Sequence, residues 1–301
     1  MSDLTKIDFA VIFSAKNANP NGDPLNGNRP RQNYDGFGEV SDVCLKRKLR
    51  NRLQAMGESI FVQSDENRND DYRSLNERFE AAIKDKKKDT NLNVAEITKL
   101  ACEKWFDVRA FGQVFAFKDK KDKKKKEKQE SDEENEHDTE GNSGSVSIGI
   151  RGPVTIQSAF SVEHITTESL QITKSVNLET NKEQPEKKGS DTMGMKHRVN
   201  NAIYVAYGAI NTQLAKKTGF SEEDSKKIKE ALRTLFVNDA SSARPEGSME
   251  VLKVIWWKHN SEAGQYSSAK VHQSLKVKAN GEYDPLRDKL EGLNPEEIPG
   301  V

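Results

Sequence analysis

A segment rich in asparagine, proline and glycine, Asn17–Gln32, directly follows the first apolar run of the chain, Phe9–Phe13. The run has strand composition, and the segment holds three prolines and two glycines. Proline fixes φ and lacks an N–H donor, and glycine and asparagine tolerate positive φ. We therefore expect an irregular loop at a strand end, a place where proteins often carry function.

The polar groups of this loop suit one kind of ligand better than others. Its amides, together with Arg29 and Arg31, match phosphate and sugar oxygens more closely than they match acid–base chemistry. A turn-rich surface loop without a ligand has the same composition, so both interpretations stay open at this point.

The charge of the chain is balanced but unevenly distributed. Of its 301 residues, 32% are charged, and the formal net charge is zero, so no global field indicates a nucleic-acid partner. Residues 16–52 hold eight Lys/Arg against four Asp/Glu, whereas residues 282–301 form an acidic C-terminal tail with six acids against two bases. A local basic face beside acidic segments is compatible with RNA binding.

The chain has two cysteines, Cys44 and Cys102, which are too few for a disulfide framework and do not form a CxxC pair. Both lie in helical patterns, which indicates buried reduced thiols. The first residues, MSDLTKIDF, lack the features of a secretory signal, and no apolar run approaches the ~20 residues that span a bilayer. We expect a cytoplasmic protein without a membrane partner.

The order of apolar patterns predicts an α+β fold. Strands are expected at Lys6–Ser14, Val108–Phe117, Val146–Val162, Leu170–Val176, Met193–Val199, Asn201–Ile210 and Met249–Trp257, and helices at Asp42–Met56, Tyr72–Lys84, Val94–Lys104 and from Ser221 to Phe236. This order resembles a split βαβ, ferredoxin-like domain with large insertions. One insertion, residues 119–145, has no apolar residue, so we expect it to be disordered or extended. Contact of its lysines with nucleic acid is the less favoured alternative.

The helix Asp42–Met56 carries several cations beside its apolar face. Leu45, Leu49, Leu53 and Met56 fall on one side, with Lys46 and Arg50 flanking them and Arg47 pointing further outward. Charge reversal at Arg47 and Arg50 is therefore expected to leave the fold intact.

The search for catalytic chemistry gives mostly negative results. The sequence contains no GxxxxGK[ST] and no GxSxG, and its five histidines do not pair with His or Cys at metal-like spacing, so no metal or cofactor is expected. Asp23 and Asp35 lie in the loop after the first strand, where a carboxylate can assist RNA cleavage. Their contexts, before Pro24 and before Gly36, favour ordinary turns.

Two segments have side chains suited to nucleic-acid bases. Residues 191–198, DTMGMKHR, place Met193 and Met195 around a glycine and before Lys196, His197 and Arg198. Methionine can wedge between bases, and the cations can hold phosphates, although a core strand with a basic exit is the alternative.

The second segment is Arg109 to Gln113, in which Arg109, Phe111 and Gln113 alternate and would share one strand face. An exposed aromatic there would stack a base. Packing of Phe111 in the core is the equal alternative.

Six segments taken in order resemble one known family. They are NANPNGDPLNGNRPRQ, DVCLKRKLRN, DVRAFGQVFA, SIGIRGPVTIQSAFSV, DTMGMKHRV and AIYVAYGAI. This set is similar to the backbone subunit of type I-C CRISPR effector complexes.

The resemblance implies a modified RNA-recognition-motif palm spanning 1–301 with insertions, and a protruding β-hairpin thumb at 165–198. It also implies that the protein is not an enzyme. On the same resemblance, copies are expected to polymerise along one guide CRISPR RNA, and the thumbs are expected to kink the strand. Implied partners are the guide RNA, the target DNA strand, copies of the chain, and the guide 5′-end-capping, large and small subunits. The expected RNA contacts are Asn17, Asn19, Asn21, Asn28, Arg29, Arg31, Gln32, Lys46, Arg47, Arg50, Arg109, Phe111, Gln113, Arg151, Met193, Met195, Lys196, His197 and Arg198.

A related backbone subunit provides the alternative function. Subunits of type III complexes cut target RNA with an aspartate in a loop after the first strand. Asp23 and Asp35 lie in that region, but NPNGDP does not look like that family's loop. A metal-dependent ribonuclease is therefore the disfavoured alternative.

Overall fold

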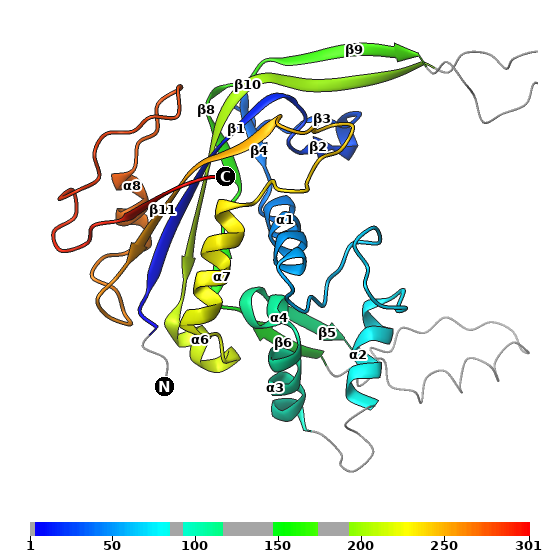
Figure 1. The fold of residues 1–301 in the computed structure, drawn as a ribbon, viewed down its shortest axis with the longest axis vertical. Coiled ribbons are helices and arrows are strands. Elements are labelled where there is room, and N and C mark those ends of the chain that lie inside the picture. Colours follow the sequence, from blue (N-terminus) through cyan, green and yellow to red (C-terminus); the bar gives the residue numbers. More distant parts are fainter. Residues whose placement is uncertain (1–3, 85–92, 117–146, 174–192) are drawn as a thin grey trace, which may run out of the picture.

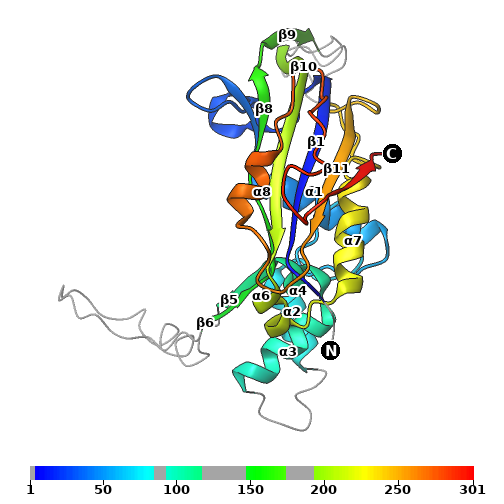
Figure 2. The ribbon, with the colours of Figure 1, turned by 90° about the vertical axis from the view of Figure 1, so that its left-hand side faces the viewer.

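The central element is an antiparallel β-sheet, seen in a computed structural model that describes residues 4–84, 93–116, 147–173 and 193–301. Its strands follow the order β12-β11-β1-β10-β8-β4 (Figures 1 and 2). They are β12 (Glu296–Pro299), β11 (Met249–Lys258), β1 (Ile7–Ala18), β10 (Met193–Ile210), β8 (Ala159–His164) and β4 (Phe37–Val40). Two further strands, β7 (Val154–Ile156) and β9 (Thr167–Thr173), also pair with β10.

The two faces of the sheet are covered by different parts of the chain. Alternation along β1 sends Phe9 and Phe13 to one face, where helices α1 (Asp42–Ala55) and α7 (Glu222–Arg233) pack. Ala10 and Ile12 point to the other face, under α8 (Ser268–Ser274) and three buried leucines: Leu286, Leu290 and Leu293. The acidic stretch 282–301 thus contributes to the core and ends in β12, which pairs with β11. The fold is a mixed α/β arrangement.

A second, smaller core lies at the lower end of the molecule in Figure 1. It joins Phe61, Phe79, Trp105 and Phe115. The elements that build it are α2 (Leu75–Lys84), α3 (Val94–Lys104), α4 (Phe106–Phe111), β5 (Gly112–Ala116) and β6 (Ser147–Arg151). We call this part the helical lobe. A short helix, α6 (Thr212–Thr218), follows β10 nearby.

Several expected helices are present and begin at or next to their expected first residue, although α7 ends at Arg233 and not at Phe236. Ser41 caps α1, its Oγ accepting from the Cys44 amide at 3.3 Å, and Ser221 and Asp224 form the capping box of α7. The strand β1 is longer than expected, because it continues to Ala18 and includes Asn17 with φ 52°. The two segments expected at 193–199 and 201–210 form one 18-residue strand, β10.

The expected strand Val108–Phe117 is wrong in its first half. Residues 106–111 form helix α4, which ends where Gly112 adopts φ 82°, and only Gly112–Ala116 are strand. Arg109 and Phe111 are therefore helical, and they share no strand face with Gln113. The expected insertion 119–145 and residues 174–192 of the expected thumb lie outside the described residues.

Both cysteines are free; Cys102 is buried and Cys44 half-buried. None of the helices in the four described ranges has the length and apolar character needed to cross a membrane.

Candidate nucleic-acid interface

The asparagine-rich segment is a folded loop held by its own amides. It contains a small hairpin of β2 (Gly22–Asp23) and β3 (Arg29–Pro30) around a 3-10 turn, η1 (Pro24–Asn26). Asn19, which is 3% exposed, donates from Nδ2 to the Asn28 carbonyl at 2.7 Å. Asn21 Oδ1 accepts from the Ser41 amide at 2.9 Å and thereby joins the loop to the start of α1. The side-chain amides of Asn19 and Asn21 therefore stabilise the loop, and the groups engaged in these bonds do not face a ligand.

The outer groups of the loop remain open to solvent. Asn17, Asn28, Arg29 and Gln32 are exposed, and Arg29 makes a 3.4 Å hydrogen bond to Asn26. Arg31 is less free, because its guanidinium lies 3.6 Å from Asp23. The exposed amide and guanidinium groups are the ones that a phosphate or ribose can reach.

The loop lies beside the base of the long β9–β10 hairpin. The strand β3 is in contact with β10, and Gln32 Nε2 donates to the Ile165 carbonyl at 3.2 Å, just before β9 begins. Figure 1 shows this hairpin leaving the sheet above the β2–β3 loop. The structure therefore brings the two candidate segments, 17–32 and 193–198, to one end of the molecule.

The hairpin exposes its methionines. Met193 is 67% and Met195 is 54% exposed, and they pair in register with Thr173 and Gln171. Gln171 donates from Nε2 to the Met193 sulfur at 2.9 Å. This exposure does not fit the alternative in which these side chains fill the core.

The three basic residues beside them differ in how fully their side chains are engaged. His197 is 7% exposed, and its ring nitrogen Nδ1 lies 2.8 Å from Ser169 Oγ. Arg198 pairs with Glu168 at 3.0 Å, and hydrogen bonds from Asn200 and Arg198 lower the pKa of the Glu168 carboxyl, which keeps that pair charged. Lys196 makes no ion pair among the described residues, so it is a free cation in the described part of the hairpin.

Arg47 and Arg50 of α1 bond to other parts of the protein instead of facing solvent. Arg50 Nε lies 3.0 Å from Asp107 Oδ2 of α4, and its guanidinium stacks 5.2 Å from the Phe111 ring centre. Arg47 donates to the Val62 carbonyl at 2.7 Å, and burial lowers the pKa of its guanidinium. The expectation that Arg47 points outward is wrong, because Val62 covers it, and Arg50, expected beside the apolar face, is covered by Asp107 of α4. Lys46 pairs with Asp42 at 2.9 Å within the helix.

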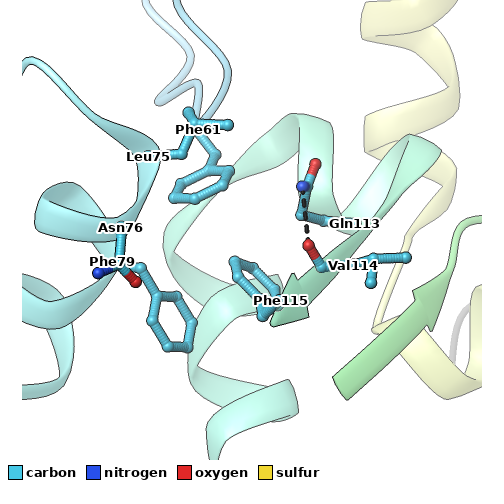
Figure 3. A pocket seen from close by; sticks show the side chains of 7 residues that line it. All are labelled: Phe61, Leu75, Asn76, Phe79, Gln113, Val114 and Phe115. Atoms are coloured by element: carbon cyan, nitrogen blue, oxygen red, sulfur yellow. Dashed lines mark hydrogen bonds between the residues drawn. The ribbon is translucent and has the colours of Figure 1, made fainter. Parts of the chain in front are cut away.

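The remaining expected contacts lie in the helical lobe. Arg109 forms a two-pronged pair with Asp224 of α7, at 2.9 Å for each contact, and so joins the lobe to the main body. Gln113 lines an aromatic pocket together with Phe61, Phe79 and Phe115 (Figure 3). Arg151 is exposed at the end of β6. The elements that carry these residues, α4, β5 and β6, lie at the opposite end of the long axis from the β9–β10 hairpin (Figure 1).

The two candidate catalytic acids have ordinary structural surroundings. Asp23 Oδ1 accepts from the Leu25 amide at 3.2 Å and caps the 3-10 turn. Asp35 is exposed in a turn closed by the Gly36 amide and the Asn33 carbonyl at 3.1 Å. Within the described parts of the chain, no group of three or more His, Cys, Asp or Glu side chains is arranged to hold a metal ion.

One element of this region was missed from the sequence. Loop 237–248, between α7 and β11, accepts two backbone hydrogen bonds at the start of the asparagine-rich segment. They run from Lys16 N, just before the segment, to Ser248 O at 2.8 Å and from Asn19 N to Ala243 O at 2.9 Å. The only sequence signal was its turn composition, SSARPEGS, which identifies a loop but not its neighbour.

Comparison with known proteins identifies the family. Residues 5–291 match the family model of the CRISPR-associated protein Cas7. A CRISPR-associated protein Cas7 of Haloferax volcanii is 32% identical over 119 residues, which is 39% of this chain and 34% of that protein, so the match spans about a third of the relative's length.

Two solved structures also match most of this chain, both with TM-scores below 0.5. A "CRISPR RNA-guided surveillance complex, pre-nicking" chain has a TM-score of 0.47 and 15% identity, over 84% of this chain and 78% of that one. A chain of another "CRISPR RNA-guided surveillance complex" has a TM-score of 0.41 and 17% identity, over 89% and 80%. On the match over residues 5–291, the chain belongs to the CRISPR-associated protein Cas7 family.

Proposed function

We propose that the chain is a non-catalytic backbone subunit that binds guide CRISPR RNA, polymerises along it and presents it for pairing with target DNA in antiviral defence. The family assignment supports a role in CRISPR immunity. The observation that carries the RNA-binding part is the β9–β10 hairpin, which exposes Met193 and Met195 and whose base contacts the loop with exposed amides and Arg29.

We expect the subunit to bind the sugar-phosphate backbone of the RNA and to insert methionine side chains between bases. Arg29 and Lys196 contribute charge for phosphates, and Asn17, Asn28 and Gln32 contribute hydrogen-bonding groups for ribose and phosphate. The thioether side chains replace stacking where the strand kinks. No base-reading set is needed for a protein that must accept any guide sequence.

The strand order supports a specific palm. Read as β11-β1-β10-β8, with α1 after β1 and α7 after β10, the sheet matches the order of a split βαβ, ferredoxin-like domain. We take this as an RNA-recognition-motif-like palm, the β9–β10 hairpin as its thumb and the helical lobe as an insertion.

The subtype and partners are part of the same proposal. The six sequence segments favour a type I-C effector complex, in which the partners are further copies of the chain, the guide 5′-end-capping subunit, and the large and small subunits. The cytoplasm, where CRISPR RNA is present and free thiols stay reduced, is the expected location.

A salt titration of RNA binding tests this proposal. Binding that depends on phosphate contacts should weaken as salt is added. For a single strand, log K should fall by ~0.7 per phosphate neutralised for each tenfold increase in salt concentration. Affinity for unrelated guide sequences of equal length should be the same. Affinity that hardly changes with salt, or that depends strongly on sequence, would contradict it.

The ribonuclease alternative has its own test. Asp23 is engaged by Arg31 and by the Leu25 amide, which favours a structural role for this carboxylate. Incubating the assembled complex with complementary RNA and Mg²⁺ should leave that RNA intact. Regularly spaced cuts that disappear in Asp23→Asn or Asp35→Asn would establish the alternative.

A further inference from the structure

Asp239, in loop 237–248, holds two cations from different parts of the chain. Its Oδ2 accepts from Lys48 Nζ of α1 and also lies 3.0 Å from Arg244 Nε of its own loop. The Lys48 side chain is 4% exposed and stacks 5.6 Å from the Phe236 ring centre. A buried ammonium needs such a partner, so the carboxylate ties the loop to α1.

The same loop is closed by its own hydrogen bonds and is hydrogen-bonded to the start of the asparagine-rich segment. Ser241 and Arg244 exchange backbone hydrogen bonds of 2.8 and 3.1 Å, which close a tight turn. The Ser248 and Ala243 carbonyls of the loop accept hydrogen bonds from the amides of Lys16 and Asn19, at 2.8 and 2.9 Å. Asn19 in turn holds the carbonyl of Asn28 at 2.7 Å. A continuous set of bonds therefore runs from Asp239 to the residue before Arg29.

We propose that Asp239 is a positioning residue for the guide-RNA interface, acting through loop 237–248 to fix segment 17–31 in the conformation that presents Asn28 and Arg29. This rests on the proposed function. The proposal predicts a change in RNA affinity opposite to the one expected from charge, because Asp239 is an acid close to a surface that binds an anion. By electrostatics alone, removing its charge should strengthen RNA binding. By positioning, removing it should weaken RNA binding.

A matched pair of variants separates the two effects. Asp239→Asn and Glu246→Gln each remove one negative charge from the same loop, and Glu246 is exposed. With single-stranded guide RNA at fixed salt, we expect Asp239→Asn to bind at least about tenfold more weakly than the wild type. Glu246→Gln should stay within about twofold of the wild type or bind slightly more tightly. Equal or tighter binding by Asp239→Asn overturns the positioning role.

Amide hydrogen exchange of the RNA-free protein gives a second readout. The amides of Lys16 and Asn19 should exchange faster in Asp239→Asn than in the wild type, and Glu246→Gln should leave them unchanged. Unchanged protection in Asp239→Asn overturns the proposed linkage even if RNA binding falls.

A third variant covers the case in which Asp239→Asn unfolds. Replacing both members of the buried pair, Lys48→Met with Asp239→Leu, leaves only the partly exposed Arg244 without its partner and is expected to fold. It should show the same loss of RNA affinity, and wild-type affinity in this folded variant overturns the proposal. If the wild type itself binds no guide RNA, the proposed function fails and the positioning role with it. If the wild type binds and all variants bind equally, only the positioning role fails.

Discussion

Arg50 Nε of α1 lies 3.0 Å from Asp107 Oδ2 of α4, and the Asp107 side chain is 1% exposed. The same carboxylate accepts from the backbone amides of Phe61 at 2.7 Å and Val62 at 3.1 Å. The pair therefore fastens the helical lobe to the helix that packs on the sheet. Arg50 stabilises the fold, and it is not a free cation for RNA.

Charge reversal at Arg50 should accordingly destabilise the protein. Breaking one side of a buried ion pair costs about 3–5 kcal/mol, so Arg50→Glu should lower the free energy of unfolding by about that amount. Lys46→Glu is the control on the same helix, because the Lys46–Asp42 pair is partly exposed and should cost at most about 1 kcal/mol. Denaturant unfolding of the RNA-free protein measures both. An Arg50→Glu variant as stable as Lys46→Glu would show that the pair contributes nothing.

The hairpin methionines should matter for assembly but not for stability. Replacing exposed Met193 and Met195 with alanine should change the free energy of unfolding of the RNA-free chain by less than about 1 kcal/mol. It should weaken ordered assembly on guide RNA, or pairing with target DNA, because the wedge is lost. The control is Leu170→Ala with Ile172→Ala, whose residues pair with Lys196 and Gly194 on the opposite hairpin face. A large loss of melting temperature in the methionine variant would contradict the account.

Acid should destabilise the protein through a buried cluster at the start of β1. Asp8 Oδ2 lies 2.8 Å from His259 Nε2, and Asp8 Oδ1 lies 3.7 Å from His272 Nε2. Burial lowers the pKa of His272 below 6.5, so below that pH the unfolded chain binds a proton that the folded chain excludes, and stability falls. Burial alone would raise the pKa of the Asp8 carboxyl, but its interactions with His259, Ser268 and Lys6 outweigh burial and lower the pKa below 3.8. Stability therefore falls further when stronger acid protonates Asp8.

The His272 contribution can be removed by substitution. A His272→Gln side chain can still donate to the Gly208 carbonyl, which His272 Nε2 contacts at 3.1 Å, but it has no charge to gain. Its melting temperature should therefore fall less between pH 7 and pH 5 than that of the wild type. Parallel melting curves for the two proteins over this range would contradict the assignment.

Deleting residues 119–145 should leave the fold intact. The strands β5 and β6 are antiparallel, and Ala116 pairs directly with Ser147, so a short turn can join them. The deleted stretch has no apolar residue to remove from a core, and loop length alters closure entropy only slowly. Melting temperature and RNA affinity of the deletion variant should match the wild type within error. A large drop in either would assign the segment a packing or binding role.

The parts of the fold with strong local signals were predictable. Ser41 and the leucine spacing defined α1, and Ser221 with three acids defined α7. The exposed position of Met193 and Met195 was left open, because a short apolar strand has the same composition in a core and on a hairpin.

Other features depend on residues distant in sequence. Periodicity identified one buried face of α1, but the layer over Arg47 and Arg50 comes from Val62 and from Asp107. The acids of 282–301 suggested a tail, yet Leu290 and Leu293 are buried against the sheet. The contact between Asn19 and loop 237–248 joins residues more than two hundred positions apart, and no local pattern specifies it.

The most direct test of the central claim is the RNA that purifies with the protein. Nuclease treatment of the native complex, followed by extraction and sequencing, should yield one discrete class of small RNA, protected at regular intervals and carrying CRISPR repeat sequence. Met193→Ala with Met195→Ala should disturb the regular protection. A protein that purifies without RNA, or with fragments of random length and sequence, would contradict its role as the backbone of a guide-RNA complex.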